Sequence, residues 1–355
     1  MTHVSAPDQA RWSGKTRRAA GAAVAVTGLI LVAGCHVPGT GSSAAAGPTA
    51  SGTVTVVAAP SVADAPLYIG IRDGLFSRAG LTVHVVPTSS VAQEVSALRA
   101  GSADVAFGDY ADMFYQQELK SSPHLALVAD GYDAGPNVME VLTLPGSRIT
   151  SPADLEHKSI GTPAQQGMPT KVNNNPLPYS QETLATWSVL NSDHVSPADI
   201  AWTPMPSTDL ITALRTHAVD AILATEPTIY EAESELGAVP VLDACTGATA
   251  NLPLAGYFTD NAYASHHAAV IAAFRAALER AQAQGAMAAP IQAALTKSVG
   301  LRPQTAELVT FGQYPTTLSA QNVQRVVDLM FFFNTLGKTF NVSSMLASHA
   351  AGTAK

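Results

Sequence analysis

Two apolar segments of the sequence end in side chains that could bind a small molecule. One segment ends in Thr225 and Glu226, and the other ends in Asp109 and Tyr110. The two segments match with a constant offset of 116 residues, so Tyr110 corresponds to Glu226. A strand that runs through a core and then ends in a carboxylate predicts a ligand beyond that strand end. The alternative is a coincidental match between two ordinary helix-turn-strand units.

Polar groups follow two further predicted strands. Segments 61–66 and 162–168 each come directly after an apolar run. Ligands of parallel α/β sheets bind beyond the carboxyl ends of the strands, where helix starts leave N–H groups unpaired. We therefore expect all four strand ends to meet at one site. The predicted ligand-binding residues are Ser61, Asp64, Pro66, Tyr68, Asp109, Tyr110, Gln165, Gln166, Met168, Thr225 and Glu226.

Each of these residues also has a structural interpretation. Asp109 and Glu226 are well placed to cap the helices that follow them. Tyr68 and Tyr110 could be core aromatic residues whose hydroxyl groups are satisfied. The segment 165–168 could be a loop that binds nothing. The convergence of four strand ends favours the binding hypothesis.

The charges at the predicted site indicate what kind of solute it would take. Asp109, Asp112 and Glu226 supply carboxylates, and Lys171 is the one cation in these segments. Small anions such as nitrate or sulfonates need cationic donors or several N–H groups from helix starts. The balance therefore favours a neutral or cationic solute, such as a heteroaromatic ring stacked on Tyr68 or Tyr110.

The elements that must position these groups are strands alternating with helices. Strands are predicted at 54–59 and 81–86, with a helix at 65–79 between them. The alternation restarts after residue 151 and ends with a helix at about 320–336. Strands that alternate with helices indicate an α/β protein with largely parallel sheets. The repeated segments indicate two similar α/β lobes.

The N-terminal part of the sequence is typical of an exported lipoprotein. It has a basic start, an apolar run at 19–32 and the sequence Val-Ala-Gly-Cys ending at Cys35. We predict a signal peptide at 1–34, a lipid on Cys35 and a flexible tether at 35–52. The protein would then be anchored at the outer face of the cytoplasmic membrane. An uncleaved membrane segment and a plain signal peptide are the alternatives, and the export route stays open between the general and twin-arginine pathways.

Composition and motifs exclude several other classes. The chain is 47% hydrophobic and 13% charged, so it can bury large cores and is not disordered overall. Its net charge of -8 offers no footprint for nucleic acid. No Walker-type loop, His-Glu-x-x-His or Gly-x-Ser-x-Gly occurs, and we expect no cofactor and no metal site. With Cys35 lipidated, Cys245 has no disulfide partner in the mature chain.

Four motifs in order resemble the substrate-binding proteins of ABC transporters for nitrate, sulfonates, taurine and thiamine-pyrimidine precursors. The resemblance covers nearly all of the mature chain. The motifs are LYIGIRDGLF at 67–76, GSADVA at 101–106, SPADL at 151–155 with the strand after it, and VDA at 219–221 with Glu226.

The resemblance implies a two-lobed periplasmic-binding-protein type II fold, with helices on a mixed, mostly parallel sheet in each lobe. Residues 53–138 and 245–346 would form lobe one, 139–244 lobe two, and 347–355 a C-terminal tail. The protein would be a monomeric receptor that closes on a small solute and delivers it to a membrane permease and its ATPase. Glu226 would face Asp109 and Tyr110 across the cleft.

Two other classes compete with the receptor. Some thiamine-pyrimidine synthases share this fold but depend on a His/Cys-rich motif, which this sequence lacks. We therefore expect no enzymatic activity. A lipoprotein that binds a protein partner as a sensor or adhesin is the other alternative.

Overall fold

The structure is a computed structural model that describes residues 51–119, 124–164 and 180–347. All described residues belong to one compact unit that begins at Ala46. The predicted signal peptide, Cys35, almost all of the tether and nearly all of the tail lie outside the described residues. So do Lys171 and three of the predicted ligand-binding residues, Gln165, Gln166 and Met168.

Sheet A contains five strands in the order β2-β1-β3-β10-β4. The first three are parallel, and β10 is antiparallel to both of its neighbours. β4 is buried at every position, as expected for a strand covered on both faces. The strands are β1 (Gly52–Ala58), β2 (Leu81–Pro87), β3 (Val105–Asp109), β4 (Leu125–Asp133) and β10 (Pro253–Asp260).

Sheet B repeats this arrangement with the strand order β7-β6-β8-β5-β9. Again the first three strands are parallel, and β5 is antiparallel to β8 and β9. The bounds of β8 equal those of β3 shifted by 116 residues, as the repeat predicts. The strands are β5 (Met139–Thr143), β6 (Ser159–Pro163), β7 (Ala201–Met205), β8 (Ala221–Thr225) and β9 (Val239–Asp243).

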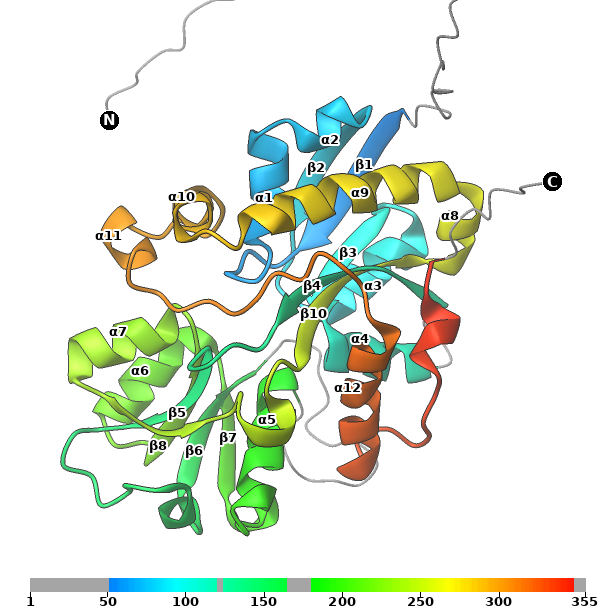
Figure 1. The fold of residues 1–355 in the computed structure, drawn as a ribbon. Helices are drawn as coiled ribbons and strands as arrows, with labels where there is room; N and C mark the ends of the chain where they lie inside the picture. Colours follow the sequence, from blue (N-terminus) through cyan, green and yellow to red (C-terminus); the bar gives the residue numbers. More distant parts are fainter. Residues whose placement is uncertain (1–50, 120–123, 165–179, 348–355) are drawn as a thin grey trace, which may run out of the picture. The chain divides into compact units, whose positions relative to one another are not determined.

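The chain enters sheet B between β4 and β5 and returns to sheet A between β9 and β10 (Figure 1). Sheet B is therefore built from one continuous segment, whereas sheet A needs β10 from after the return. The α/β fold with two mixed sheets agrees with the prediction. The sequence analysis did not identify β5, β7 or β10 as strands.

The helices around sheet A include the long α9 (Ala268–Gln284), which packs on β2, β4 and α1 (Ala65–Arg72), the first helix among the described residues. Helix α12 (Ala320–Phe332) contacts β10 of sheet A and also α5 (Gln181–Ser192), which lies beside sheet B. The sheet A helices are α1 (Ala65–Arg72), α2 (Leu75–Arg78), α3 (Val91–Ala100), α4 (Tyr110–Glu118), α8 (Asn261–His266), α9 (Ala268–Gln284), α10 (Ala288–Ser298), α11 (Pro303–Ala306), α12 (Ala320–Phe332) and the short η4 (Val342–Met345).

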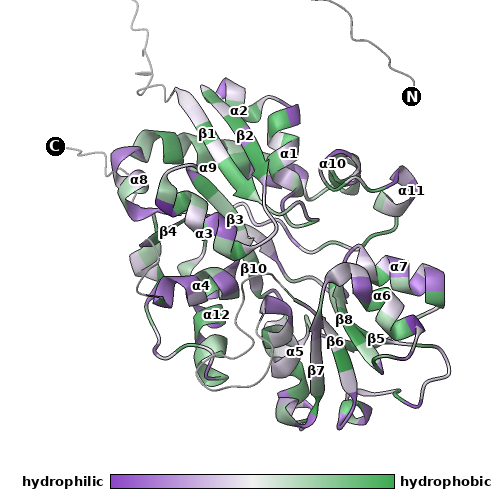
Figure 2. Cartoon of the chain, turned by 180° about the vertical axis from the view of Figure 1, so that it is seen from behind, coloured by the Kyte–Doolittle hydropathy of each residue, from purple (hydrophilic) through white to green (hydrophobic). Residues whose placement is uncertain are grey.

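Two helices beside sheet B, α6 (Ser207–Arg215) and α7 (Thr228–Leu236), bury apolar side chains such as Leu210 and Ile229 on one face. Figure 2 shows hydrophobic colour on strands such as β2 and β8 and hydrophilic colour over much of α7. The elements are η1 (Pro152–Leu155), α5 (Gln181–Ser192), η2 (Pro197–Asp199), α6 (Ser207–Arg215), α7 (Thr228–Leu236) and η3 (Gly247–Thr249). In the described part of the chain, no helix is long and apolar enough to cross a membrane.

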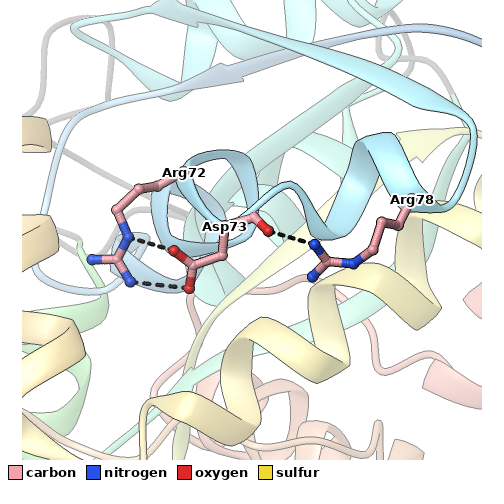
Figure 3. Close-up of polar contacts among 3 residues, drawn as sticks. All are labelled: Arg72, Asp73 and Arg78. Atoms are coloured by element: carbon pink, nitrogen blue, oxygen red, sulfur yellow. Dashed lines mark hydrogen bonds and ion pairs between the residues drawn. The ribbon is translucent and has the colours of Figure 1, made fainter.

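The predicted helix at 65–79 is two helices, and a polar corner separates them (Figure 3). Gly74 has a φ of 66°, a conformation that favours glycine and stops α1 from continuing. Arg72 donates two hydrogen bonds to the Asp73 carboxylate, at 2.6 and 3.1 Å. Arg78 donates to the Asp73 carbonyl oxygen at 2.8 Å. The sequence Arg-Asp-Gly in the first motif thus makes a turn on the surface.

Candidate binding cavity

A cavity of about 340 Å³ opens at the carboxyl ends of strands from both sheets. Residues that follow β1 and β3 line it from sheet A, and residues that follow β6 and β8 line it from sheet B. This is where parallel α/β sheets place their ligands. The volume suits a small solute, near the lower end of known ligand pockets.

Four of the predicted ligand-binding residues line this cavity, and they come from opposite sheets. Ser61 follows β1 and Asp109 is the last residue of β3, whereas Thr225 is the last residue of β8 and Glu226 follows it. The meeting of these strand ends thus brings together side chains that are up to 165 residues apart in sequence. Asp64, Pro66, Tyr68 and Tyr110 are absent from the described lining.

Tyr110 lies in the core beneath the cavity and has no exposed surface. Its hydroxyl donates to Asp130 at 2.8 Å, and its ring packs on Phe114 and Phe258 with centroids 5.6 Å away in both cases. A Cβ at Gly256 would come within 2.6 Å of the Tyr110 hydroxyl oxygen, so this close approach requires glycine. Tyr110 therefore cannot stack on a solute, and the core interpretation describes it. Tyr68 is partly buried and packs against the hydrophobic core.

Asp64 and Pro66 shape the turn after β1. Asp64 is fully buried and accepts the backbone N–H of Ser61 at 3.1 Å. Burial raises the pKa of Asp64 to about 7. Pro66 lies in the first turn of α1, where its missing N–H costs nothing. These two residues position Ser61, which lines the cavity.

Glu226 lies in the cavity lining and also caps a helix. Its carboxylate lines the cavity, and Oε2 accepts the N–H of Tyr230 in the first turn of α7 at 3.2 Å. Oε1 accepts the N–H of Thr310, in the segment after α11, at 2.9 Å. Burial raises the pKa of Glu226, and the two backbone N–H groups offset part of that shift. One carboxylate thus caps a helix near sheet B and connects it to a segment that follows β10.

Glu94 is a cavity residue that the sequence analysis missed. It lies in the first turn of α3, and its residue exposure is 2%. Oε1 accepts the Thr88 hydroxyl at 2.9 Å, whereas Oε2 has no hydrogen-bond partner among the described residues. Burial raises the pKa of Glu94 to about 8. A Cβ at Gly108 would lie 2.8 Å from Oε2, so the glycine at the end of β3 leaves room for this carboxyl group.

Gln181 and Glu182 bring the start of α5 to the same place. The Ala111 N–H at the start of α4 donates to Gln181 Oε1 at 3.0 Å, which directs Nε2 elsewhere. Gln181 Nε2 and Glu182 Oε2 are both buried without a hydrogen-bond partner in the described part of the chain. Both residues line the cavity. The same expectation of a ligand beyond strand ends, extended to the strand at 81–86, would have pointed to Glu94. No comparable signal in the sequence pointed to α5.

Asp112 lies behind the cavity wall and is fully buried. Its pKa is raised well above the usual value, first by burial and then by repulsion from Asp109, Glu182 and Glu94. The electrostatic coupling places these four carboxyl groups in one region. Burial and repulsion thus both favour the protonated form of Asp112.

Another part of the lining is apolar. Phe107, Tyr132, Val138, Met139 and Leu254 belong to it. The Tyr132 hydroxyl accepts the Gly312 N–H at 2.6 Å, so its ring is fixed with its polar tip satisfied. Aromatic and aliphatic walls with a few polar groups are typical of sites for small organic molecules.

The described residues offer no arrangement of three or more His, Cys, Asp or Glu side chains suited to a metal ion. Cys245 is buried outside the described lining, and burial raises its pKa far above that of a free thiol. Of the described lining residues, none is Cys or His.

Comparisons with known proteins agree with this architecture. A family model described as NMT1/THI5 like matches residues 62–293. A search of curated proteins gives no significant match.

Solved structures share the fold at low identity. The periplasmic aliphatic sulphonate binding protein SsuA from Escherichia coli aligns with a TM-score of 0.65 at 17% identity, covering 83% of this chain and 97% of that one. The periplasmic nitrate-binding protein NrtA from Synechocystis PCC 6803 aligns with a TM-score of 0.62 at 11% identity, covering 82% and 84%. The desulfurization enzyme DSZB aligns with a TM-score of 0.62 at 16% identity, covering 83% and 96%.

Proposed function

Because this chain belongs to the NMT1/THI5-like family, we propose that it is the extracytoplasmic solute-binding receptor of an ABC importer. The observation that carries the proposal is the cavity, which both sheets line at their strand ends. Structural relatives described as periplasmic binding proteins for sulphonate and nitrate have the same fold. A receptor of this kind hands its solute to a membrane permease driven by an ATPase.

The proposed receptor closes two lobes on its solute. Lobe one comprises 53–138 and 245–346, and lobe two comprises 139–244. The sheets support this division, since β5 to β9 form sheet B and the other strands form sheet A. Hydrogen bonds between described residues of the two lobes include those from Ala111 N to Gln181 and from Thr310 N to Glu226. Closure would desolvate the solute, so its polar groups need partners in the walls.

We place the receptor at the outer face of the cytoplasmic membrane, as a monomer anchored by a lipid on Cys35. The sequence around Cys35 and the tether at 35–52 support this anchor. The periplasmic location that the relatives' names record supports an extracytoplasmic site of action.

Two solute classes follow from the sequence and the comparisons. A heteroaromatic vitamin precursor would use the apolar wall around Phe107 and Tyr132. A sulfonate or nitrate would match the solutes named for the structural relatives, and taurine is itself a sulfonate. Tyr110 cannot stack on a solute of either class, because its ring is buried in the core.

An enzyme is the alternative from another class, because the desulfurization enzyme DSZB has a similar fold. The lining described above contains carboxyl, amide and hydroxyl groups but no thiol or imidazole among the described residues. That composition supports binding without turnover. Chromatography of each bound compound before and after incubation with the protein tests this, since a receptor returns it unchanged.

The receptor function is tested in cells that lack this chain. The full-length chain is purified in mild detergent, and the solute that accompanies it is identified by mass spectrometry. We expect cells without the chain to lose uptake of that solute, and the wild-type gene to restore it. A Glu156→Gln variant, altered at an exposed site outside the lining, is the matched control and should also restore uptake. Normal uptake without the chain would contradict the importer function.

A further inference from the structure

Gln181 is a cavity residue whose side-chain hydrogen bonding is only half complete. It is the first residue of α5, beside sheet B, and its exposure is 2%. The Ala111 N–H in the first turn of α4, beside sheet A, donates to Oε1 at 3.0 Å. Nε2 has no hydrogen-bond partner among the described residues. The amide thus connects the two lobes through its oxygen and retains a buried donor.

The bond from Ala111 determines which end of the amide is the free donor. A backbone N–H can be accepted only by the oxygen of an amide side chain, so exchanging Oε1 and Nε2 would lose this bond. A buried N–H without an acceptor is costly, because it has lost its hydration and gained no partner. Since Gln181 lines the cavity, an acceptor on a bound solute would remove that cost.

An oxyanion is poorly suited to be that acceptor. Small anions are held by cationic donors or by several N–H groups from helix starts. Of the described lining residues, none is Lys, Arg or His. The ionisable side chains among them are carboxyl groups, apart from Tyr132. A sulfonate or nitrate would therefore find no cation in the described lining.

The helix starts around the cavity already donate to protein oxygens. In each of α3, α4, α5 and α7, at least one first-turn N–H has a side-chain acceptor. These N–H groups are the ones that would otherwise surround an anion. An uncharged acceptor needs only one donor, which Gln181 supplies. The occupied donors are Gln93, Ala111, Thr183 and Tyr230, and their acceptors are Ser90, Gln181, Ser180 and Glu226 in the same order.

The cavity also offers an apolar surface for the body of an organic molecule. Phe107 on β3 and Met139 on β5 belong to the lining that contains Gln181. Apolar walls combined with a few placed polar groups are typical of sites for small organic molecules. The lining thus fits a solute that has an apolar body and at least one acceptor.

We propose that Gln181 determines the specificity of the cavity by donating from Nε2 to an uncharged carbonyl oxygen of the solute. This assignment rests on the receptor function proposed above and names the acceptor group of its solute. The Ala111 N–H positions the amide, and Phe107 and Met139 contact the apolar body of the solute. Because Ala111 and Gln181 belong to different lobes, this bond orients the donor only when the lobes meet.

The test compares three probes of nearly the same shape. Acetophenone has a carbonyl oxygen, α-methylstyrene has a CH₂ group in its place, and benzoate is an oxyanion on the same ring. Binding to the full-length chain in mild detergent is measured by ligand-detected NMR, after dialysis has removed any co-purified solute. Free probe concentrations are corrected for uptake into protein-free micelles.

We expect the wild-type chain to bind acetophenone most tightly of the three probes. Its affinity should exceed that of α-methylstyrene by about fivefold to a hundredfold, because α-methylstyrene leaves the Gln181 N–H buried without an acceptor. Benzoate should bind at least about tenfold more weakly than acetophenone, since it finds no cation in the described lining.

A variant then assigns the preference to Gln181. Gln181→Met keeps the length of the side chain and removes its amide, so the ratio of acetophenone to α-methylstyrene affinity should fall at least about fivefold. A merely structural role would weaken both probes alike and leave the ratio unchanged. Gln304→Met is the matched control, because Gln304 is exposed and lies outside the described lining, and it should keep the wild-type ratio. Should Gln181→Met fail to fold, the order of the three probes on the wild-type chain decides.

The outcomes separate the acceptor group from the receptor function. Tighter binding of benzoate than of acetophenone overturns the assignment and leaves a receptor for anions. Equal affinities of the wild type for acetophenone and α-methylstyrene also overturn it, as do an unchanged ratio in Gln181→Met and binding of none of the three probes. The receptor function stands or falls separately, on the uptake of the co-purified solute.

Discussion

The ends of β3 and β8 occupy the same place in two copies of one structural unit but use their side chains differently. Tyr110 after β3 points into the core and bonds to Asp130. Glu226, its counterpart after β8, lines the cavity and accepts N–H groups from Tyr230 and Thr310. A repeat in sequence therefore fixes the backbone of an element more firmly than the direction and role of each side chain.

The largest effect is expected where Tyr110 supports the core. Tyr110→Ala would empty a fully buried aromatic site and should lower the free energy of unfolding by about 3–5 kcal/mol. Urea denaturation followed by circular dichroism measures this. Tyr110→Phe is the milder companion, losing the bond to Asp130 but not the packing, and should cost about 1–3 kcal/mol. An Ala variant as stable as the wild type would show that the ring does not carry the packing assigned to it.

Gly256→Ala tests the packing around Tyr110 from the neighbouring strand, β10. The added Cβ would lie 2.6 Å from the Tyr110 hydroxyl oxygen, so the ring or β10 must shift. Overpacking of this kind should cost about 1–3 kcal/mol of unfolding free energy, again measured in urea. Gly52→Ala is the control, since nothing lies within 4 Å of its added Cβ. Combining Gly256→Ala with Tyr110→Phe, which removes the clashing oxygen, should recover part of the loss.

Glu226→Ala tests the counterpart of Tyr110, which lines the cavity. The variant loses the acceptor at the start of α7 and the bond to Thr310, and should lose about 1–2 kcal/mol of unfolding free energy. Affinity for the co-purified solute should also fall by about 1–3 kcal/mol, which calorimetry measures. Tyr110→Phe, which leaves the lining intact, should keep wild-type affinity. Reduced stability with unchanged affinity would assign Glu226 to capping alone.

The smallest expected effect is a pH dependence of stability that Glu94 contributes. Its pKa is about 8 in the folded protein, above the ordinary carboxyl value of 4.5. The folded state thus binds its proton more tightly, and this stabilising contribution is complete below pH 4.5 and lost as pH rises towards 8. Its Oε1 faces Thr88, the Ala59 N–H also faces the carboxyl group, and Asp109 and Asp64 repel it.

Glu94→Gln should therefore flatten the fall of Tm between pH 5 and pH 8. Other carboxyl groups with raised pKa values, including Asp64 and Asp130, keep part of the slope in the variant. Glu156→Gln, at an exposed position, should leave the slope unchanged. A Glu94→Gln profile parallel to that of the wild type would contradict the raised pKa.

Local sequence signals predicted much of the fold. Apolar runs identified β1, β2, β3 and β8, because each run ends at a proline or at polar residues. The break at Gly74 was missed, since a glycine inside an apolar helical pattern can also be tolerated. β10 was missed because a strand placed between β3 and β4 is selected by contacts far away in sequence.

The site was predictable where a strand end determines it. Ser61, Asp109, Thr225 and Glu226 line the cavity because they follow strands that meet there. Tyr110 was misjudged because its direction depends on the room that Gly256 leaves for it. Gln181 reaches the cavity through tertiary packing that no local pattern records. That Ser61, Asp109, Thr225 and Glu226 bind a solute stays a prediction.

The position of β10 has a consequence for the order in which this chain can fold. Every strand of sheet B lies between residues 139 and 243, so that half is complete before β10 is made. Sheet A cannot close the gap between β3 and β4 until residues 253–260 arrive, more than a hundred residues after β4. Contacts of such high sequence separation form slowly. A chain emerging N-terminus first therefore leaves the facing edges of β3 and β4 unpaired until residues 253–260 have been made.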